Sequence, residues 1–89
     1  MEVQENNTGN IMLYDVNKPI NIVAQYLEDK NINNAGNIFI VWMCYILGNR
    51  KYFIGTTNTD KYFEVTYNKT KDEWYIDVYN KIDNICIKN

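Results

Sequence analysis

Residues 38–80 read IFIVWMCYILGNRKYFIGTTNTDKYFEVTYNKTKDEWYIDVYN, and they carry the clearest secondary-structure pattern of the chain. Short runs rich in β-branched and aromatic residues alternate with turn residues, which is typical of an antiparallel meander. The predicted strands are Ile38–Leu47, Arg50–Thr56, Lys61–Tyr67 and Glu73–Asn80, and a short fifth strand at Asn84–Ile87 is a further candidate. The turns expected between them are Gly48-Asn49, Thr57–Asp60 and Lys69–Asp72.

The segment before the sheet predicts one helix, from about Lys18 to Asp29. Asn17 is the expected N-cap residue of this helix, before Lys18 and Pro19. A proline in the first turn gives up only a donor that would be unpaired there. Ile20, Val23, Ala24 and Leu27 recur at helical spacing and form one apolar face. We therefore expect an α+β fold, a four- or five-stranded antiparallel meander sheet with one helix packed on one face.

The first sixteen residues are the least informative part of the chain. Residues 1–10 are polar and are expected to form a flexible arm, whereas Ile11–Tyr14 are apolar enough for a short strand or an anchoring arm. The whole chain, 1–89, is long enough for one hydrophobic core and too short for two. We expect a single domain.

Turn lengths set the strand register, and the register sorts the side chains because successive residues of a strand face opposite ways. The expected pairs are Leu47 with Arg50, Thr56 with Lys61 and Asn68 with Glu73. One face then carries the predicted core: Val41, Met43, Tyr45, Tyr52, Ile54, Phe63, Val65, Tyr67, Trp74, Ile76 and Val78. A register shifted by one residue at the second turn would bury Phe53 together with Lys51, so it ranks lower.

The opposite face carries the candidate binding residues. Trp42 is expected across from Gly55, and Glu64 directly across from Asp77. Rings and carboxylates are mixed on this face, which favours a protein partner, because tyrosine and tryptophan are enriched at interface cores. The predicted partner-binding residues are Trp42, Phe53, Tyr62, Glu64, Tyr75, Asp77 and Tyr79.

Two alternatives remain open for this face. A single-stranded nucleic-acid-binding module would stack bases on such rings, but these platforms sit in positive grooves, and here the formal net charge is −2. Nucleic acid is therefore not the expected partner. Alternatively, the face is covered by Ile11–Tyr14, by Ile85 and Ile87, or by a second copy of the chain in a homodimeric structural protein.

Catalysis is not expected. The chain has no histidine to move protons near neutral pH, and Glu64 with Asp77 is the nearest approach to a catalytic pair. Cys44 and Cys86 are too few for a disulfide scaffold, and neither has a histidine to activate it. We predict no enzyme activity, no cofactor and no metal site. With no leader pattern and no apolar run long enough to cross a bilayer, a cytoplasmic location without membrane contact is expected.

From Ile38 onward the chain resembles a family of short phage and prophage proteins of unknown function from Gram-positive hosts. The resemblance covers about residues 38–88 and rests on Trp42, Thr56-Thr57, Glu64, Thr66-Tyr67-Asn68, and Asp77 with Tyr79. Family members usually have a glycine in the turn after the threonines, where this chain has Asn58-Thr59-Asp60. The resemblance implies a phage accessory protein in the host cytoplasm that binds a host protein, for example as an anti-CRISPR-like inhibitor of host defence. It carries no catalytic residue to transfer.

Overall fold

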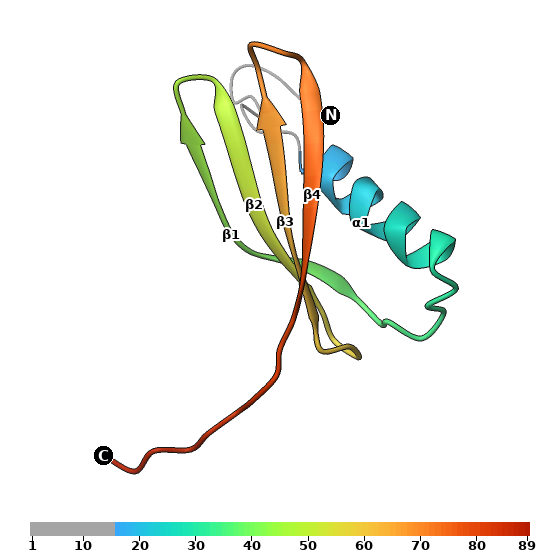
Figure 1. Ribbon diagram of the computed structural model, residues 1–89, viewed down its shortest axis with the longest axis vertical. Helices are drawn as coiled ribbons and strands as arrows, with labels where there is room; N and C mark the ends of the chain where they lie inside the picture. Colours follow the sequence, from blue (N-terminus) through green and yellow to red (C-terminus); the bar gives the residue numbers. More distant parts are fainter. Residues whose placement is uncertain (1–15) are drawn as a thin grey trace, which may run out of the picture.

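The computed structural model describes residues 16–89, which form one helix and a four-stranded antiparallel sheet (Figure 1). The elements are α1 Asn17–Asp29, β1 Ile38–Ile46, β2 Asn49–Thr56, β3 Lys61–Asn68 and β4 Glu73–Asn80. The strands lie in the sheet in chain order, β1-β2-β3-β4. The predicted α+β meander is thus confirmed with four strands. The predicted arm at 1–10 and the apolar segment Ile11–Tyr14 lie outside the described residues.

Helix α1 begins at Asn17, one residue before the predicted start. The N-cap position belongs to Val16, which has no side-chain capping bond, so the prediction of Asn17 as the N-cap was wrong by one position. Val23 and Leu27, four residues apart, are buried, whereas Ala24 is exposed. Residue 24 is rotated about 100° from residue 23 around the helix axis, which turns it out of the buried stripe.

The core lies between α1 and one face of the sheet, called here the inner face. Its buried apolar residues are Val23, Leu27, Ala35, Tyr52, Ile54, Phe63 and Val65. The ring of Tyr26 meets Phe63 edge to face, with centroids 5.5 Å apart. The helix packs against β1, β2 and β3, so the centre of the sheet is covered on this side.

The first hairpin turns at Leu47-Gly48, one residue earlier than the predicted Gly48-Asn49. Both residues have positive φ angles, 53° for Leu47 and 85° for Gly48. Tight hairpins favour positive φ at both central positions, because that backbone twist matches the twist of the strands. The register between β1 and β2 is therefore displaced by two residues near the turn, which leaves every side chain there on its predicted face.

A β-bulge interrupts β1 between Ile40 and Trp42 and reverses the alternation of side chains. Ile38 and Ile40 pack against the core, whereas Val41, predicted in the core, is exposed. Trp42 lies opposite Phe53, so the prediction that it pairs with Gly55 was wrong. The partner of Gly55 is instead Phe39.

Two further predicted core residues, Tyr45 and Val78, are exposed. Val78 lies on β4, outside the main packing of α1 on β1 to β3. Tyr45 lies beside the first hairpin, one row of inner-face residues beyond buried Tyr52. A helix of 13 residues spans only about 20 Å and is too short to cover the full length of the strands. The remaining predicted core residues, Met43, Tyr67, Trp74 and Ile76, are partly buried.

The other two strand pairings agree with the sequence prediction. Gly55 pairs with Tyr62, the same register as the expected Thr56 with Lys61, and Asn68 pairs with Glu73. The register shifted by one residue is therefore wrong. Lys51 lies on the same face as Phe53, away from the helix.

The segment 81–89 forms no strand, so the predicted fifth strand at Asn84–Ile87 does not form within the described chain. It leaves the end of β4 and runs away from both the sheet and the helix (Figure 1). Ile85 and Ile87 are exposed and do not cover the sheet. In the part of the chain that is described, no helix is long and apolar enough to cross a membrane.

Candidate protein-binding face

The sheet face turned away from α1, called here the outer face, carries all seven residues predicted to bind a partner. The strand register arranges its side chains in three rows that cross the sheet. The rows, from β1 to β4, are Phe39–Gly55–Tyr62–Tyr79, Trp42–Phe53–Glu64–Asp77 and Cys44–Lys51–Thr66–Tyr75. Trp42, Tyr75, Asp77 and Tyr79 are exposed, and Phe53, Tyr62 and Glu64 are half-buried.

Three of the predicted rings form a continuous stack across β1, β2 and β3. Trp42 lies 5.9 Å from Phe53 between ring centroids, with 17° between the planes. Phe53 lies 5.3 Å from Tyr62, with 2° between the planes. Tyr79 follows on β4, directly opposite Tyr62 in the register. Stacked rings hold one another in place, so the outer face presents a preformed aromatic surface.

Gly55 leaves room for the ring of Tyr62, at one end of this stack. A Cβ atom on Gly55 would lie 3.0 Å from the Phe39 ring and 3.1 Å from the Tyr62 ring. The two rings therefore lie over bare backbone, which a larger residue would push apart. The sequence analysis expected a ring over this glycine but assigned it to Trp42 instead of Phe39, because the bulge in β1 leaves no sequence signal.

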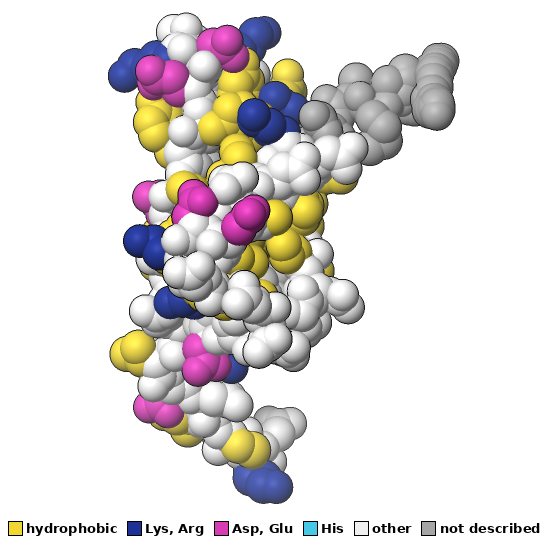
Figure 2. Space-filling model, turned by 90° about the vertical axis from the view of Figure 1, so that its right-hand side faces the viewer, with side chains coloured by type: hydrophobic (Ala, Val, Ile, Leu, Met, Phe, Trp, Pro, Cys, Tyr) yellow, Lys and Arg dark blue, Asp and Glu magenta, His cyan; other side chains and the backbone are white. Residues whose placement is uncertain are grey.

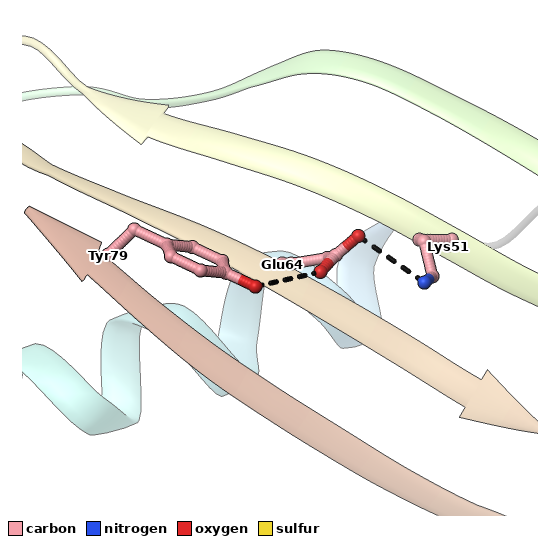
Figure 3. A network of polar contacts seen from close by, with 3 residues as sticks. All are labelled: Lys51, Glu64 and Tyr79. Atoms are coloured by element: carbon pink, nitrogen blue, oxygen red, sulfur yellow. Dashed lines mark hydrogen bonds and ion pairs between the residues drawn. The ribbon is translucent and has the colours of Figure 1, made fainter. Parts of the chain in front are cut away.

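Glu64 is held by two neighbours in the middle of the outer face (Figure 3). Lys51 Nζ lies 3.3 Å from Glu64 Oε2, and the Tyr79 hydroxyl donates to Glu64 Oε1 at 3.2 Å. The hydrogen bond to Glu64 raises the pKa of the Tyr79 phenol, and the negative charge of Glu64 adds to the effect. The sequence analysis gave Glu64 no neighbour other than Asp77, so this contact of Lys51 was missed, although Lys51 has the same strand parity as Phe53.

Asp77 lies directly opposite Glu64 as predicted, and its exposed carboxylate makes no hydrogen bond or ion pair with another described residue. Tyr75 lies one row away, on the far side of Asp77 from Tyr79. Its hydroxyl donates to Glu73 Oε1, which raises the pKa of the Tyr75 phenol. The structure thus brings six predicted site residues close together and places Tyr75 at their margin.

Two shallow hollows flank the first hairpin. One, on the outer face, has a volume of about 200 Å³ and is lined mainly by Cys44, Ile46, Lys51 and Thr66. The other, of about 310 Å³, includes Tyr45, Arg50 and Tyr67 of the inner face. Neither of these two hollows is lined by Glu64 or Asp77.

Arg50 is the residue of the inner face that sequence reasoning overlooked. Its guanidinium lies 4.7 Å from the Tyr67 ring centroid and 5.5 Å from that of Trp74. Such cation–π contacts hold the charge over the rings and order the end of the sheet that α1 does not cover. The sequence did contain a signal for this position, because Arg50 and Tyr52 are two residues apart in β2 and therefore face the same side of the sheet.

In the described range 16–89, no group of three or more Cys, Asp or Glu side chains could hold a metal ion. Cys44 is half-buried and Cys86 is exposed, and both are free thiols. The outer face offers aromatic surface, one charge network and one open carboxylate.

Comparison with protein families gives a match that covers most of the chain. The model of a family of unknown function, DUF6275, matches residues 16–89. The match includes α1 as well as the sheet, and so begins earlier than the region 38–88 noted from the sequence. No curated protein and no solved structure matches the chain.

Proposed function

The chain belongs to the family of unknown function DUF6275, and we propose that it is a non-catalytic protein-binding module that uses the outer face of its sheet. The observation that carries the proposal is the stack of Trp42, Phe53 and Tyr62, whose outermost ring is exposed. Rigid aromatic rings give large contact area at low cost in conformational entropy, and they dominate interface cores.

The charges on the outer face favour a protein partner over a nucleic acid. Lys51, the basic side chain beside the stack, is already paired with Glu64. The exposed carboxylate of Asp77 lies on β4, directly opposite Glu64. Phosphate groups would be repelled by this acid, whereas an arginine or lysine of a partner protein would find an acceptor beside aromatic surface.

We propose that the chain is a phage protein and that its partner is a protein of the bacterial host. Binding would inhibit a defence protein in the host cytoplasm. This part of the proposal rests on the resemblance of residues 38–88 to short phage and prophage proteins. The outer face supports it in one respect, because a binder that acts by covering a surface needs rings and complementary charge but no catalytic group.

The test is capture of the partner by the tagged full chain from a lysate of infected host cells, followed by a binding titration with the purified partner. Trp42→Ala should weaken binding about thirtyfold or more, because truncating an anchoring ring costs at least about 2 kcal/mol, and Tyr75→Ala, at the margin of the face, should weaken binding by a smaller factor. The matched control is Tyr45→Ala, since Tyr45 is 51% exposed on the inner face and Tyr75 is 42% exposed on the outer face.

Both outer-face variants should keep the circular dichroism spectrum of the wild type, and Trp42→Ala should lower the melting temperature by no more than about 8 °C. Equal binding by all three variants would overturn the proposal. Salt-sensitive binding to single-stranded oligonucleotides that Trp42→Ala abolishes would instead support the nucleic-acid alternative. If Tyr75→Ala unfolds the domain, the outer face is part of a core and the contact surface lies elsewhere.

A further inference from the structure

The C-terminal segment, residues 81–89, has the sequence of a strand but no strand partner in the described chain. Its backbone runs on from β4 as a drawn-out trace (Figure 1). The Lys81 amide donates to the Asp60 carbonyl at 2.6 Å, one residue past the end of the β3–β4 ladder. Beyond that point the only further hydrogen bond given by a described tail residue is local, from the Asn84 amide to its neighbour Asp83. The segment therefore continues the line of a strand, but beyond Lys81 no described residue forms strand hydrogen bonds with it.

Three isoleucines make the exposure of this segment unusual. Ile82, Ile85 and Ile87 are 93%, 71% and 85% exposed, and hydrophobic side chains are visible along the tail at the bottom of Figure 2. The segment points away from its own sheet, so its own core is not available to bury them (Figure 1). β-branched residues at positions 85 and 87 lie on one side of an extended strand, the pattern of a segment that packs against a surface.

The outer edge of β4 is the matching surface. β4 is the last strand of the sheet, and no described residue pairs with its outer edge. Exposed edges of this kind accept an added strand through backbone hydrogen bonds. The other edge strand, β1, carries the bulge at Val41, and a bulge interrupts the regular ladder that an added strand needs.

We propose that two copies of the chain pair antiparallel through β4 and the C-terminal segment, around a two-fold axis at Lys81. Residues 82–89 of each copy are long enough to run along all eight residues of β4 in the other copy. The interface is self-complementary and closed, because each copy gives one segment and accepts one. The result is a continuous eight-stranded sheet with a β1 strand at each end.

This register places the tail residues opposite suitable neighbours. In an antiparallel pair, residues directly opposite share a face of the sheet. With the axis at Lys81, Ile87 lies opposite Tyr75 on the outer face, and Ile85 lies opposite Asp77, between the rings of Tyr75 and Tyr79. Cys86 faces Ile76 on the inner face. On the inner face α1 packs mainly on β1 to β3. The exposure of Val78 shows that the inner side of β4 has space for a further side chain.

The dimer uses the β4 edge and leaves the rings of Trp42, Phe53 and Tyr62 open, so two outer faces would lie side by side in one sheet. It places Ile85 and Ile87 beside Tyr75, Asp77 and Tyr79, whereas Trp42 lies on β1 at the other edge of the sheet and tests the proposed function separately. Failure to form the dimer would not affect the binding proposal, and loss of partner binding in Trp42→Ala would not affect the dimer.

The first test is the mass in solution of the full chain and of a variant that ends at Lys81, by light scattering and sedimentation. The full chain should have twice the monomer mass of 10.6 kDa, and the shortened chain should be a monomer with an unchanged circular dichroism spectrum. The double variant Ile85→Asp, Ile87→Asp should also be monomeric. A monomeric full chain, or a dimer that survives removal of 82–89, would overturn the proposal.

The second test locates the axis. Lys81→Cys in a background with Cys44→Ala and Cys86→Ala places two thiols across the proposed two-fold axis, within the Cα separation that a disulfide accepts. Mild oxidation should give a covalent dimer. Lys71→Cys, in the turn at the other end of β4, is the control and should stay uncrosslinked. If Lys71→Cys crosslinks as fast as Lys81→Cys, or Lys81→Cys does not crosslink, the axis is wrong and the proposal fails.

Discussion

The rings of Phe53 and Tyr62 stack almost parallel, with centroids 5.3 Å apart, although Phe53 pairs with Glu64 in the strand register and Tyr62 pairs with Gly55. The contact is thus diagonal across β2 and β3. Diagonal neighbours on a sheet are within reach of aromatic side chains, and the absence of a side chain at Gly55 leaves room for it. The stack extends to Trp42, so rings on three strands form one surface.

Trp42 and Phe63 should differ sharply in what their truncation costs. Phe63 is fully buried against α1, so Phe63→Ala should lower the free energy of unfolding by about 3–5 kcal/mol. Trp42 is exposed, and Trp42→Ala should cost only about 1 kcal/mol, mainly the contact with Phe53. Urea denaturation followed by circular dichroism measures both. Similar losses in the two variants would show that the outer face is core.

Leu47→Asn should stabilise the protein. Leu47 has a φ of 53° and is 93% exposed, so its side chain contributes little packing while its backbone is strained. Asparagine tolerates this conformation better, and the sequence Asn-Gly suits a two-residue hairpin. We expect a gain of about 0.5–1 kcal/mol, or roughly 2–8 °C in melting temperature.

The matched control at this position is Leu47→Val. A β-branched side chain is a poor fit for positive φ, so this variant should melt below the wild type. If asparagine and valine shift the melting temperature in the same direction, strain at Leu47 is not the cause.

Gly55→Ala should destabilise the sheet by about 1–3 kcal/mol, because the added Cβ would meet the rings of Phe39 and Tyr62. Phe39 is exposed and its ring can be removed at small cost. In the background Phe39→Ala, the cost of Gly55→Ala should fall by at least about 0.5 kcal/mol, as the double-mutant cycle will show. Strict additivity of the two changes would mean that the ring of Phe39 does not crowd this position.

The Tyr79 phenol should titrate above the ordinary tyrosine pKa of 10.0, because it donates a hydrogen bond to Glu64. Glu64→Gln should bring its pKa down, as followed by NMR of isotopically labelled tyrosine over alkaline pH. The titration of Tyr75, whose partner is Glu73, should not change and serves as the control. An unchanged pKa of Tyr79 in Glu64→Gln would contradict the contact.

The same pair makes a contribution to stability with a definite pH dependence. Since the folded state raises the pKa of Tyr79, the folded protein holds the proton more tightly than the unfolded chain. The contribution is fully present below pH 10 and is lost as the pH rises through the folded pKa. Glu64→Gln should therefore flatten the fall in melting temperature at alkaline pH, and the neighbouring ion pair with Lys51 should add little because it is partly exposed.

The α+β class, the four strands and two of the three strand registers followed from the sequence, because the signals involved are local. The turn Lys69–Asp72 fixes how Asn68 meets Glu73, and period-2 alternation then places Glu64 opposite Asp77. The same alternation put the seven candidate residues on one face, and the bulge did not disturb them because Trp42 lies on the hairpin side of it.

The tertiary structure decided what alternation alone could not. Because of the bulge at Val41, Ile38 and Ile40 pack against the core and Val41 does not. The bulge also pairs Phe39 with Gly55. A bulge forms where packing against the neighbouring strand and the helix favours it, and such packing involves residues distant in the chain. The limited reach of α1 likewise left Tyr45 and Val78 exposed, because coverage depends on where the helix lies and not on the strand's own pattern. The strand predicted at Asn84–Ile87 has the right residues but no partner in the described chain, since a strand exists only where another edge meets it.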